Sequence, residues 1–288
     1  MTGTLARNVL GVTFQNPVLL ASGTAGYGRE LDGVMDLEAL GGIVTKAVSL
    51  EPRRGNAAPR VGEFPGGMIN SVGLANPGLG AVRQHDLPWL AGHISKARVL
   101  VNVVGFREEE YAAVVSGLDA GSGFVAYELN LSCPNTAKGG IEFGAEPESV
   151  ARIVGSVRKV TKRPIFAKLS PVLPDVATMA CAARDAGADG VSLVNTMPGY
   201  LYDGDRPRLG QGNGGISGPA LRPVGLLAVR RVAERTSGDL PIIGVGGVST
   251  AEHVREYLRS GASLVAIGTA ALADPRLPGR IVKELERG

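Results

Sequence analysis

The order of apolar and amphipathic segments constrains the fold of this chain most strongly. Eight short apolar, β-branched runs alternate with amphipathic stretches along its 288 residues. Runs that are nearly continuously apolar indicate strands buried on both faces, as in a parallel sheet. Eight strand–helix repeats predict an α/β protein with a (β/α)8 TIM barrel, and an open doubly wound sheet is the alternative. The expected strands are Pro17–Ala21, Gly42–Ala47, Val99–Val104, Phe124–Leu131, Ile165–Leu169, Gly190–Asn195, Pro241–Val245 and Leu264–Ile267.

The segments around these strands fit the same plan. Segment Thr4–Phe14 predicts an N-terminal β-hairpin that closes the barrel floor. Two stretches rich in Gly, Pro and Asn, Leu50–Pro88 and Met197–Pro219, predict long loops on the C-terminal face, where loops shape active sites. No Gly/Ser/Pro-rich linker interrupts the chain, so residues 1–288 are expected to form one domain. Helices are expected at Glu148–Val160, Asp175–Ala186, Pro223–Arg235 and Ala251–Ser260.

Composition excludes several classes of function. The net charge is only +3, and the basic pairs Arg53-Arg54 and Arg230-Arg231 are too short to support nucleic-acid binding. No apolar run is long enough for a membrane span, and the N-terminal residues lack the apolar core of a secretory signal. Two cysteines without an export signal indicate the cytoplasm, where thiols stay reduced.

Polar residues interrupt the apolar runs where the expected strands end. Lys46 and Lys168 each follow or end a buried strand, and a buried ammonium needs an anion or another partner unless it reaches the rim. Carboxamides present both donors and an acceptor, which suits the edges of an amide-containing heterocycle. Asn76 precedes a proline and could instead be a turn residue. The carboxamide set is Asn70, Asn76, Asn102, Asn130, Asn135 and Asn195.

Glycines follow the last two expected strands, in Gly244–Ser249 and Gly268–Ala270. Loops at these positions of a barrel often bind phosphate, because glycine lets backbone N–H groups approach an anion closely. One such motif would be as well explained by a tight turn. Two neighbouring motifs favour a phosphorylated cofactor or substrate.

Cys133 lies just past the run Phe124–Leu131 and is flanked by carboxamides. The three histidines, His85, His93 and His253, are not at strand ends, so histidine-dependent hydrolysis and a metal site lack support. A cysteine without a histidine can be a nucleophile or a general base, and a flavin enzyme that oxidises a carbon acid would use a thiolate base. The other cysteine, Cys181, lies on the apolar face of the expected helix Asp175–Ala186 and is expected to be buried in the core.

These residues resemble the class 1 dihydroorotate dehydrogenases, flavoproteins of pyrimidine (UMP) biosynthesis, over nearly the whole chain. The motifs that carry the resemblance are Ala21-Ser22-Gly23, Lys46, Glu51–Asn56, Pro59-Arg60, Asn70–Leu74, Asn76-Pro77-Gly78, Asn130–Asn135, Lys168, Asn195-Thr196, Ser217-Gly218-Pro219, Gly246-Gly247 and Gly268-Thr269.

The resemblance implies oxidation of (S)-dihydroorotate to orotate with one FMN per chain. It implies that Cys133 takes a proton from C5 while hydride passes from C6 to FMN N5, and that Lys168 stabilises negative charge on the reduced flavin. The implied substrate residues are Lys46, Asn70, Ser71, Val72, Gly73, Leu74, Asn130, Asn135, Asn195 and Thr196. The implied FMN residues are Ser22, Lys46, Ala47, Asn102, Asn130, Lys168, Val194, Gly218, Gly246, Gly247, Gly268 and Thr269.

Within that class, Glu51-Pro52-Arg53, Asn195-Thr196 and Gly215–Ala220 resemble the NAD⁺-linked class 1B catalytic subunit. That subclass implies a homodimer core with two partner subunits, which carry FAD and a [2Fe–2S] cluster and pass electrons to NAD⁺. The fumarate-dependent class 1A enzymes, which are homodimers, are one alternative. A flavin enzyme for another pyrimidine and a phosphate-binding barrel without catalysis are the others.

Overall fold

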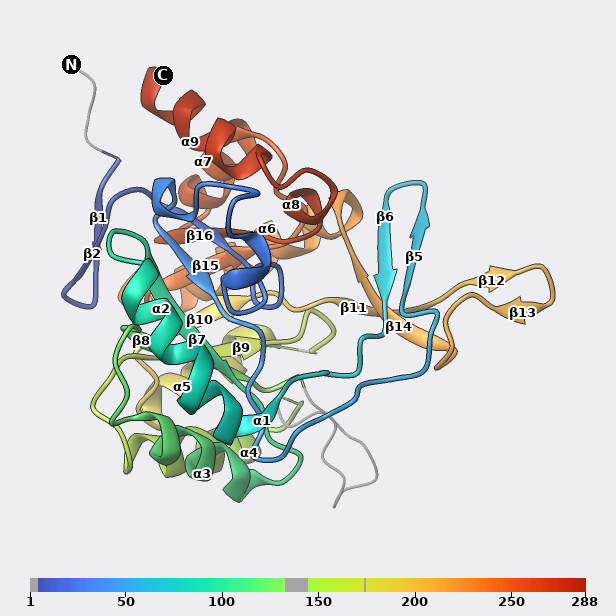
Figure 1. Ribbon diagram of the computed structural model, residues 1–288. Helices are drawn as coiled ribbons and strands as arrows, with labels where there is room; N and C mark the ends of the chain where they lie inside the picture. Colours follow the sequence, from blue (N-terminus) through green and yellow to red (C-terminus); the bar gives the residue numbers. More distant parts are fainter. Residues whose placement is uncertain (1–4, 133–144, 174) are drawn as a thin grey trace.

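The computed structural model describes residues 5–132, 145–173 and 175–288, and its centre is a closed barrel of eight parallel strands (Figure 1). The last barrel strand pairs with the first through Val265 and Val18, so the barrel prediction is confirmed and the open sheet is excluded. In barrel order the strands are β3 (Val18–Leu20), β4 (Gly42–Val44), β7 (Arg98–Val103), β8 (Ala126–Asn130), β9 (Ile165–Leu169), β10 (Gly190–Leu193), β15 (Ile242–Val245) and β16 (Leu264–Ile267).

Successive side chains of each barrel strand point to opposite faces, and both faces are buried, which explains why the runs are nearly continuously apolar. On β9, Phe166 packs inside the barrel, whereas Ile165 and Ala167 pack outward against the helices. The inward-facing apolar side chains form one cluster with Leu19, Val44 and other residues of the lower barrel. Polar side chains follow above this cluster, toward the C-terminal ends of the strands.

The expected N-terminal hairpin closes the other end of the barrel. Strands β1 (Arg7–Val9) and β2 (Val12–Phe14) pair antiparallel. Val9 and Phe14 are buried and join the cluster inside the barrel. The Arg98 guanidinium, at the start of β7, donates to the Thr13 carbonyl oxygen at 2.9 Å. The prediction that this segment forms the floor is confirmed.

Helices cover the outside of the barrel, and the four expected ones lie within two residues of their predicted bounds. Asp175 caps α5, because its carboxylate accepts from the N–H groups of Ala177 and Thr178. The prediction for Cys181 was wrong: it is half-buried, because it lies beside rather than within the buried face of α5. The α-helices are α1 (Gly78–Ala81), α2 (Leu87–His93), α3 (Glu108–Leu118), α4 (Pro147–Arg158), α5 (Val176–Asp185), α6 (Arg222–Arg235), α7 (Ala251–Arg259), α8 (Thr269–Ala273) and α9 (Leu277–Arg287).

Short 3₁₀ helices η1 (Arg29–Leu31) and η2 (Leu37–Ala39) connect β3 to β4, and η6 (Pro219–Leu221) precedes α6. A π-helical turn, η3 (Val82–Asp86), joins α1 to α2. In the described part of the chain no helix is both long and apolar enough to cross a membrane.

The two insertions, expected as loops, form regular structure together. An antiparallel sheet in the order β11-β14-β6-β5 combines strands from both (Figure 1). The hairpin of β12 (Tyr202–Asp203) and β13 (Arg206–Pro207) projects beyond that sheet. The sheet strands are β5 (Val61–Phe64), β6 (Gly67–Asn70), β11 (Met197–Tyr200) and β14 (Asn213–Ser217). Glycine is required in this sheet because the backbones of β6 and β14 approach each other closely. A Cβ on Gly67 would lie 2.1 Å from the Ser217 carbonyl oxygen.

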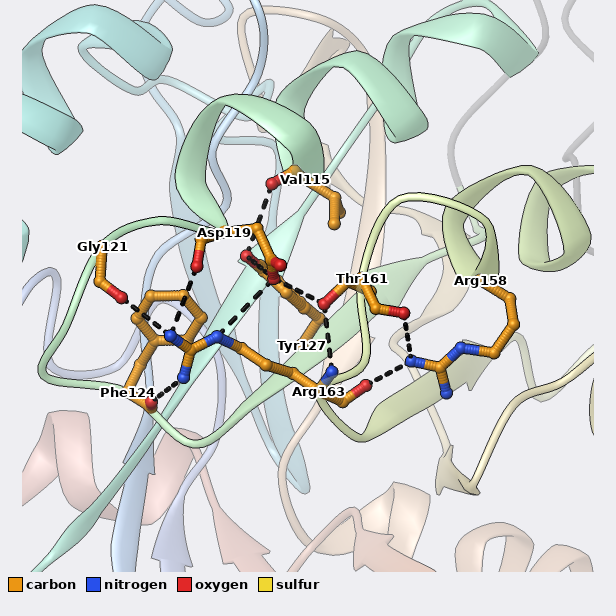
Figure 2. Close-up of polar contacts among 8 residues, drawn as sticks. All are labelled: Val115, Asp119, Gly121, Phe124, Tyr127, Arg158, Thr161 and Arg163. Atoms are coloured by element: carbon orange, nitrogen blue, oxygen red, sulfur yellow. Dashed lines mark hydrogen bonds and ion pairs between the residues drawn. The ribbon is translucent and has the colours of Figure 1, made fainter.

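A polar network ties α3, β8 and the loop before β9 together outside the barrel (Figure 2). The Asp119 carboxylate accepts from the Tyr127 and Thr161 hydroxyls. The Arg163 guanidinium donates to the carbonyl oxygens of Gly121 and Phe124 at 2.7 and 2.8 Å. These contacts pair the polar groups at the end of α3 with those of β8 and of the loop before β9, so we assign them a role in the stability of the fold.

Candidate active site

The barrel brings the predicted strand-end residues to one mouth, although they are spread from Ser22 to Thr269. Parallel strands end at the same edge, so closure of the barrel gathers their last residues. Cys133 and Asn135, the predicted base and one predicted substrate residue, lie outside the described residues.

Lys168 extends across this mouth. Its strand β9 lies four strands from β3 around the barrel, yet its Nζ donates to Ser22 Oγ, just past β3, at 3.0 Å. Nζ also lies 3.6 Å from Glu128 Oε1, and the two side chains are 7% and 2% exposed. The requirement that a buried lysine find a partner is therefore met by a carboxylate and a hydroxyl rather than by the rim.

Asn102 is held from both sides. Its backbone N–H donates to Thr45 Oγ1 at 3.1 Å, and its Nδ2 donates to Glu128 Oε1 at 2.7 Å. The amide oxygen Oδ1 is buried and accepts no hydrogen bond from the described residues. A buried acceptor without a partner at the mouth of a barrel indicates a site for a ligand N–H or O–H group.

Glu128 is a site residue that the sequence reasoning missed. It lies within the run Phe124–Leu131, where its neighbours Tyr127 and Leu129 face outward. A lone carboxylate at an inward position of an apolar strand was the signal that could have identified it.

The ends of β8 and β10 meet through carboxamides. Asn195 Nδ2 donates to Asn130 Oδ1 at 3.2 Å, and the Thr196 N–H donates to Asn195 Oδ1 at 2.8 Å. The Tyr111 hydroxyl, from α3, donates to the Asn130 carbonyl oxygen at 2.7 Å. Val194, directly after β10, is buried, and its N–H donates to the carbonyl oxygen of Val245 on the neighbouring strand β15. The predicted site residues Asn130, Asn195 and Thr196 are thus joined by hydrogen bonds in one group.

The glycine motifs lie together on the other side of the mouth. Gly218, Gly246 and Gly247 all have positive φ, and a Cβ on Gly247 would lie 2.9 Å from the Gly218 carbonyl oxygen. Gly268 precedes α8, and a Cβ there would meet nothing closer than 3.6 Å. The Thr269 hydroxyl donates to Ser217 Oγ at 2.8 Å. The loops after β14, β15 and β16 therefore converge, as expected for a phosphate cradle.

The segment Asn70–Leu74 begins at the last residue of β6 and is braced by residues of both insertions. Asn56 Nδ2 donates to Ser71 Oγ at 2.8 Å, and a Cβ on Gly73 would lie 2.4 Å from Asn56 Oδ1. Asn70 Nδ2 donates to the Gly215 carbonyl oxygen at 3.3 Å. These contacts give the loop, including Val72 and Leu74, a defined conformation.

Asn76 has a structural role. Its Oδ1 accepts from the Gly78 N–H at 2.9 Å, and its Nδ2 donates to Ser49 Oγ and to the Leu74 carbonyl oxygen, each at 2.8 Å. The bond from the Gly78 N–H closes an Asx turn, which confirms the turn alternative for this residue.

Lys46 and Ala47 follow β4 beside the first strand-end loop. The Tyr27 hydroxyl donates to the Ala47 carbonyl oxygen at 3.0 Å, and the Lys46 N–H donates to the Gly26 carbonyl oxygen at 2.7 Å. Lys46 also lines a cavity of about 440 Å³ with Tyr27, Glu30 and Asp86. Burial, with the nearby Asp86 and Glu30 carboxylates, raises the pKa of Tyr27, so its hydroxyl stays protonated and keeps donating.

Fold and site together define a (β/α)8-barrel protein with a polar ligand site at the C-terminal mouth. The comparison with known proteins is more specific: the chain belongs to the dihydroorotate dehydrogenase family, whose profile matches residues 4–288. A relative from Solibacter usitatus, provisionally named dihydroorotate dehydrogenase A (fumarate), is 46% identical over 99% of this chain and 93% of its own length.

Other relatives carry a different subclass name. A Desulforudis audaxviator protein named dihydroorotate dehydrogenase B (NAD⁺), catalytic subunit, is 45% identical over 97% of this chain and 90% of its own length. A Geobacillus kaustophilus protein with the same name is 43% identical over 98% of this chain and 89% of its own.

Proposed function

We propose that this chain oxidises (S)-dihydroorotate to orotate in pyrimidine biosynthesis and that it is an FMN-binding catalytic subunit of class 1B. The observation that carries the proposal is the buried polar network across the barrel mouth, in a chain of the dihydroorotate dehydrogenase family. Its members come from four strand ends, so the network exists only in the closed barrel.

Two features of the mouth fit FMN. Asn102 Oδ1, which accepts no hydrogen bond from the part of the chain that the structure describes, can accept one from an N–H group of a flavin ring. The converging glycine loops, where a Cβ on Gly268 would meet no atom closer than 3.6 Å, can receive a phosphate. The residues that would hold the cofactor are Ser22, Lys46, Ala47, Asn102, Asn130, Lys168, Val194, Gly218, Gly246, Gly247, Gly268 and Thr269.

When bound, FMN supplies the acceptor for the two electrons that leave the substrate with its hydride. Lys46 and the carboxamides of Asn70, Asn130 and Asn195 bind the substrate ring and its carboxylate, with the loop Ser71–Leu74, Asn135 and Thr196. The Cys133 thiolate takes the proton from C5, which is general-base catalysis worth about 10²–10⁴-fold. Asn130, three residues before this base, is fixed by Tyr111 and Asn195.

The base assignment is tested with the two cysteines of the chain. Cys133→Ser should keep the flavin absorbance but slow flavin reduction by dihydroorotate at least about 10²-fold near neutral pH, because a serine hydroxyl is a far weaker acid than a thiol. Cys181→Ser is the matched control, because Cys181 is a half-buried residue of the outer helix α5. This variant should reduce flavin at the wild-type rate. Equal rates for Cys133→Ser and wild type would contradict the assignment.

Subclass 1B predicts a complex of a homodimer core with two electron-transfer subunits that carry FAD and a [2Fe–2S] cluster. The names of the Desulforudis and Geobacillus relatives support this proposal, whereas the Solibacter name favours fumarate as acceptor. The deciding measurement is acceptor use by the chain alone and co-expressed with such a subunit. We expect NAD⁺ reduction by the complex only. Efficient fumarate reduction by the chain alone would overturn subclass 1B.

The substrate class is tested by ligand binding to the oxidised enzyme. Orotate should perturb the flavin absorption spectrum at far lower concentration than uracil, because only orotate carries the carboxylate. Equal responses would favour a flavin enzyme for another pyrimidine. A colourless purified protein that takes up no FMN would favour the non-catalytic barrel.

A further inference from the structure

Glu128 and Lys168 are the only charged residues that are buried in the described ranges, at 1% and 5% exposure of the whole residue. They lie on neighbouring strands and face into the barrel, one layer above its apolar cluster. The sheet register pairs Glu128 with Asn102 on one side, and Lys168 with Asn130 and Ser192 on its two sides. A carboxylate therefore lies at the centre of the polar layer that forms the base of the site.

Stability does not account for this carboxylate. A buried ion pair costs the desolvation of two charges, and replacing it by apolar residues is often neutral or stabilising. The Glu128–Lys168 pair is also not closely bonded, with 3.6 Å between Nζ and Oε1. The shorter contact of Glu128 is with the neutral Asn102, at 2.7 Å.

Glu128 also determines the orientation of the Asn102 amide. A carboxylate only accepts hydrogen bonds, so it must face the Nδ2 side of that amide. The acceptor Oδ1 is then turned away from Glu128, and it is this atom that lacks a partner in the described structure. Glu128 thus decides that Asn102 presents an acceptor to the ligand rather than a donor.

We propose that Glu128 is a positioning residue of the FMN site, which orients Asn102 and offsets the charge of Lys168 so as to set the reduction potential of the bound flavin. This inference rests on the proposed FMN site. With Glu128 present, the base of the site is a neutral ion pair. Without the Glu128 charge, the Lys168 ammonium keeps only the neutral Ser22 hydroxyl as a partner among the described residues. An uncompensated cation favours the electron-rich, reduced flavin.

The test is the two-electron reduction potential of bound FMN in Glu128→Gln, which keeps the shape of the side chain and removes its charge. We expect reduced flavin to be favoured at least about tenfold over oxidised flavin relative to wild type, a rise of about 30 mV. Glu128→Asp retains the charge and should shift the potential by less than a third of that amount. Tyr127→Phe, which loses a buried hydrogen bond on the outer face of the same strand, is the matched control and should not shift it.

An unchanged or lowered potential in Glu128→Gln would overturn the inference, as would an equal shift in Tyr127→Phe. If Glu128→Gln does not fold, the comparison is between Lys168→Met and the double variant Glu128→Gln/Lys168→Met, which leaves no unpaired charge. The double variant should then have the higher potential, and equal potentials would overturn the inference. A wild-type protein that binds no FMN would instead refute the proposed function, so the two failures are distinguishable.

Discussion

At the scale of single residues, the conformation of the loop after β15 depends on Gly247. Its φ is +66°, and a Cβ there would lie 2.7 Å from Arg222 Cβ and 2.8 Å from the Arg222 N. An L side chain rarely adopts this conformation, and its Cβ would displace the start of α6. The loop has this shape only with glycine at that position.

Gly247→Ala is therefore expected to lower FMN affinity at least about tenfold and to destabilise the fold by about 1 kcal/mol or more, as for alanine at an incompatible backbone conformation. FMN titration of the apoprotein and urea denaturation measure the two effects. Gly92→Ala is the matched control, because Gly92 lies in α2 with open space around it and should gain up to about 1 kcal/mol. Normal FMN affinity in Gly247→Ala would contradict its place in the cradle.

His253 makes the same loop sensitive to pH. The Ser249 N–H donates to His253 Nδ1 at 3.2 Å, which requires a neutral acceptor nitrogen. Burial, and then the Arg222 guanidinium, lower the pKa of His253 below its usual value of about 6.5. The unfolded chain then binds the proton more tightly than the folded one, so the free energy of unfolding falls as pH drops below about 6.5.

His253→Asn keeps a side-chain acceptor but cannot titrate in this range. The variant should lose less stability than wild type between pH 7 and pH 5, as measured by urea denaturation at each pH. The comparison between the two proteins removes the contribution of carboxylates that titrate in both. The same pH dependence in both proteins would show that His253 is not the responsible group.

At the scale of elements, the sequence patterns predicted strands and helices that pack on the barrel but missed the sheet built from the insertions. Runs such as Ile165–Leu169, which is apolar except for Lys168, predict a strand because both of its faces are buried. Strand β14, Asn-Gly-Gly-Ile-Ser, has no such run, and its structure depends on pairing with β6, about 145 residues earlier in the chain. Local sequence carries no information on a partner so distant.

The network in Figure 2 shows how one element is joined to its neighbours, and it gives a prediction for stability. Tyr127 is fully buried, and its hydroxyl donates to Asp119 Oδ1 at 3.2 Å. Tyr127→Phe should lower the free energy of unfolding by about 1–2 kcal/mol, because the hydrogen bond is to a charged group and Asp119 loses one donor. Arg230→Ala, which removes an exposed pair with Glu234, should cost under about 0.5 kcal/mol. Similar losses in both variants would contradict a special role for the network.

At the scale of the whole molecule, closure of the barrel determines which residues meet. The sequence reasoning identified Lys168, Asn102 and Ser22 as site residues, but not that Lys168 reaches Ser22 across the mouth. That contact depends on the pairing of the last barrel strand with the first. Glu128 was missed for a related reason: its role depends on the positions of Asn102 and Lys168 on the neighbouring strands, and the apolar pattern of its own strand does not contain them.

The two ends of the barrel should separate stability from ligand binding. Phe14 is 2% exposed and packs from the floor hairpin into the cluster inside the barrel, at the end opposite the mouth. Phe14→Ala removes most of a buried aromatic side chain, which typically costs about 3–5 kcal/mol. At temperatures where the variant is still folded, its FMN affinity and rate of flavin reduction by dihydroorotate should remain near wild type, because none of the mouth contacts includes the floor. Urea denaturation with FMN titration on the same samples checks both parts. A parallel loss of FMN affinity well below the unfolding transition would show instead that the apolar cluster holds the polar layer above it in place.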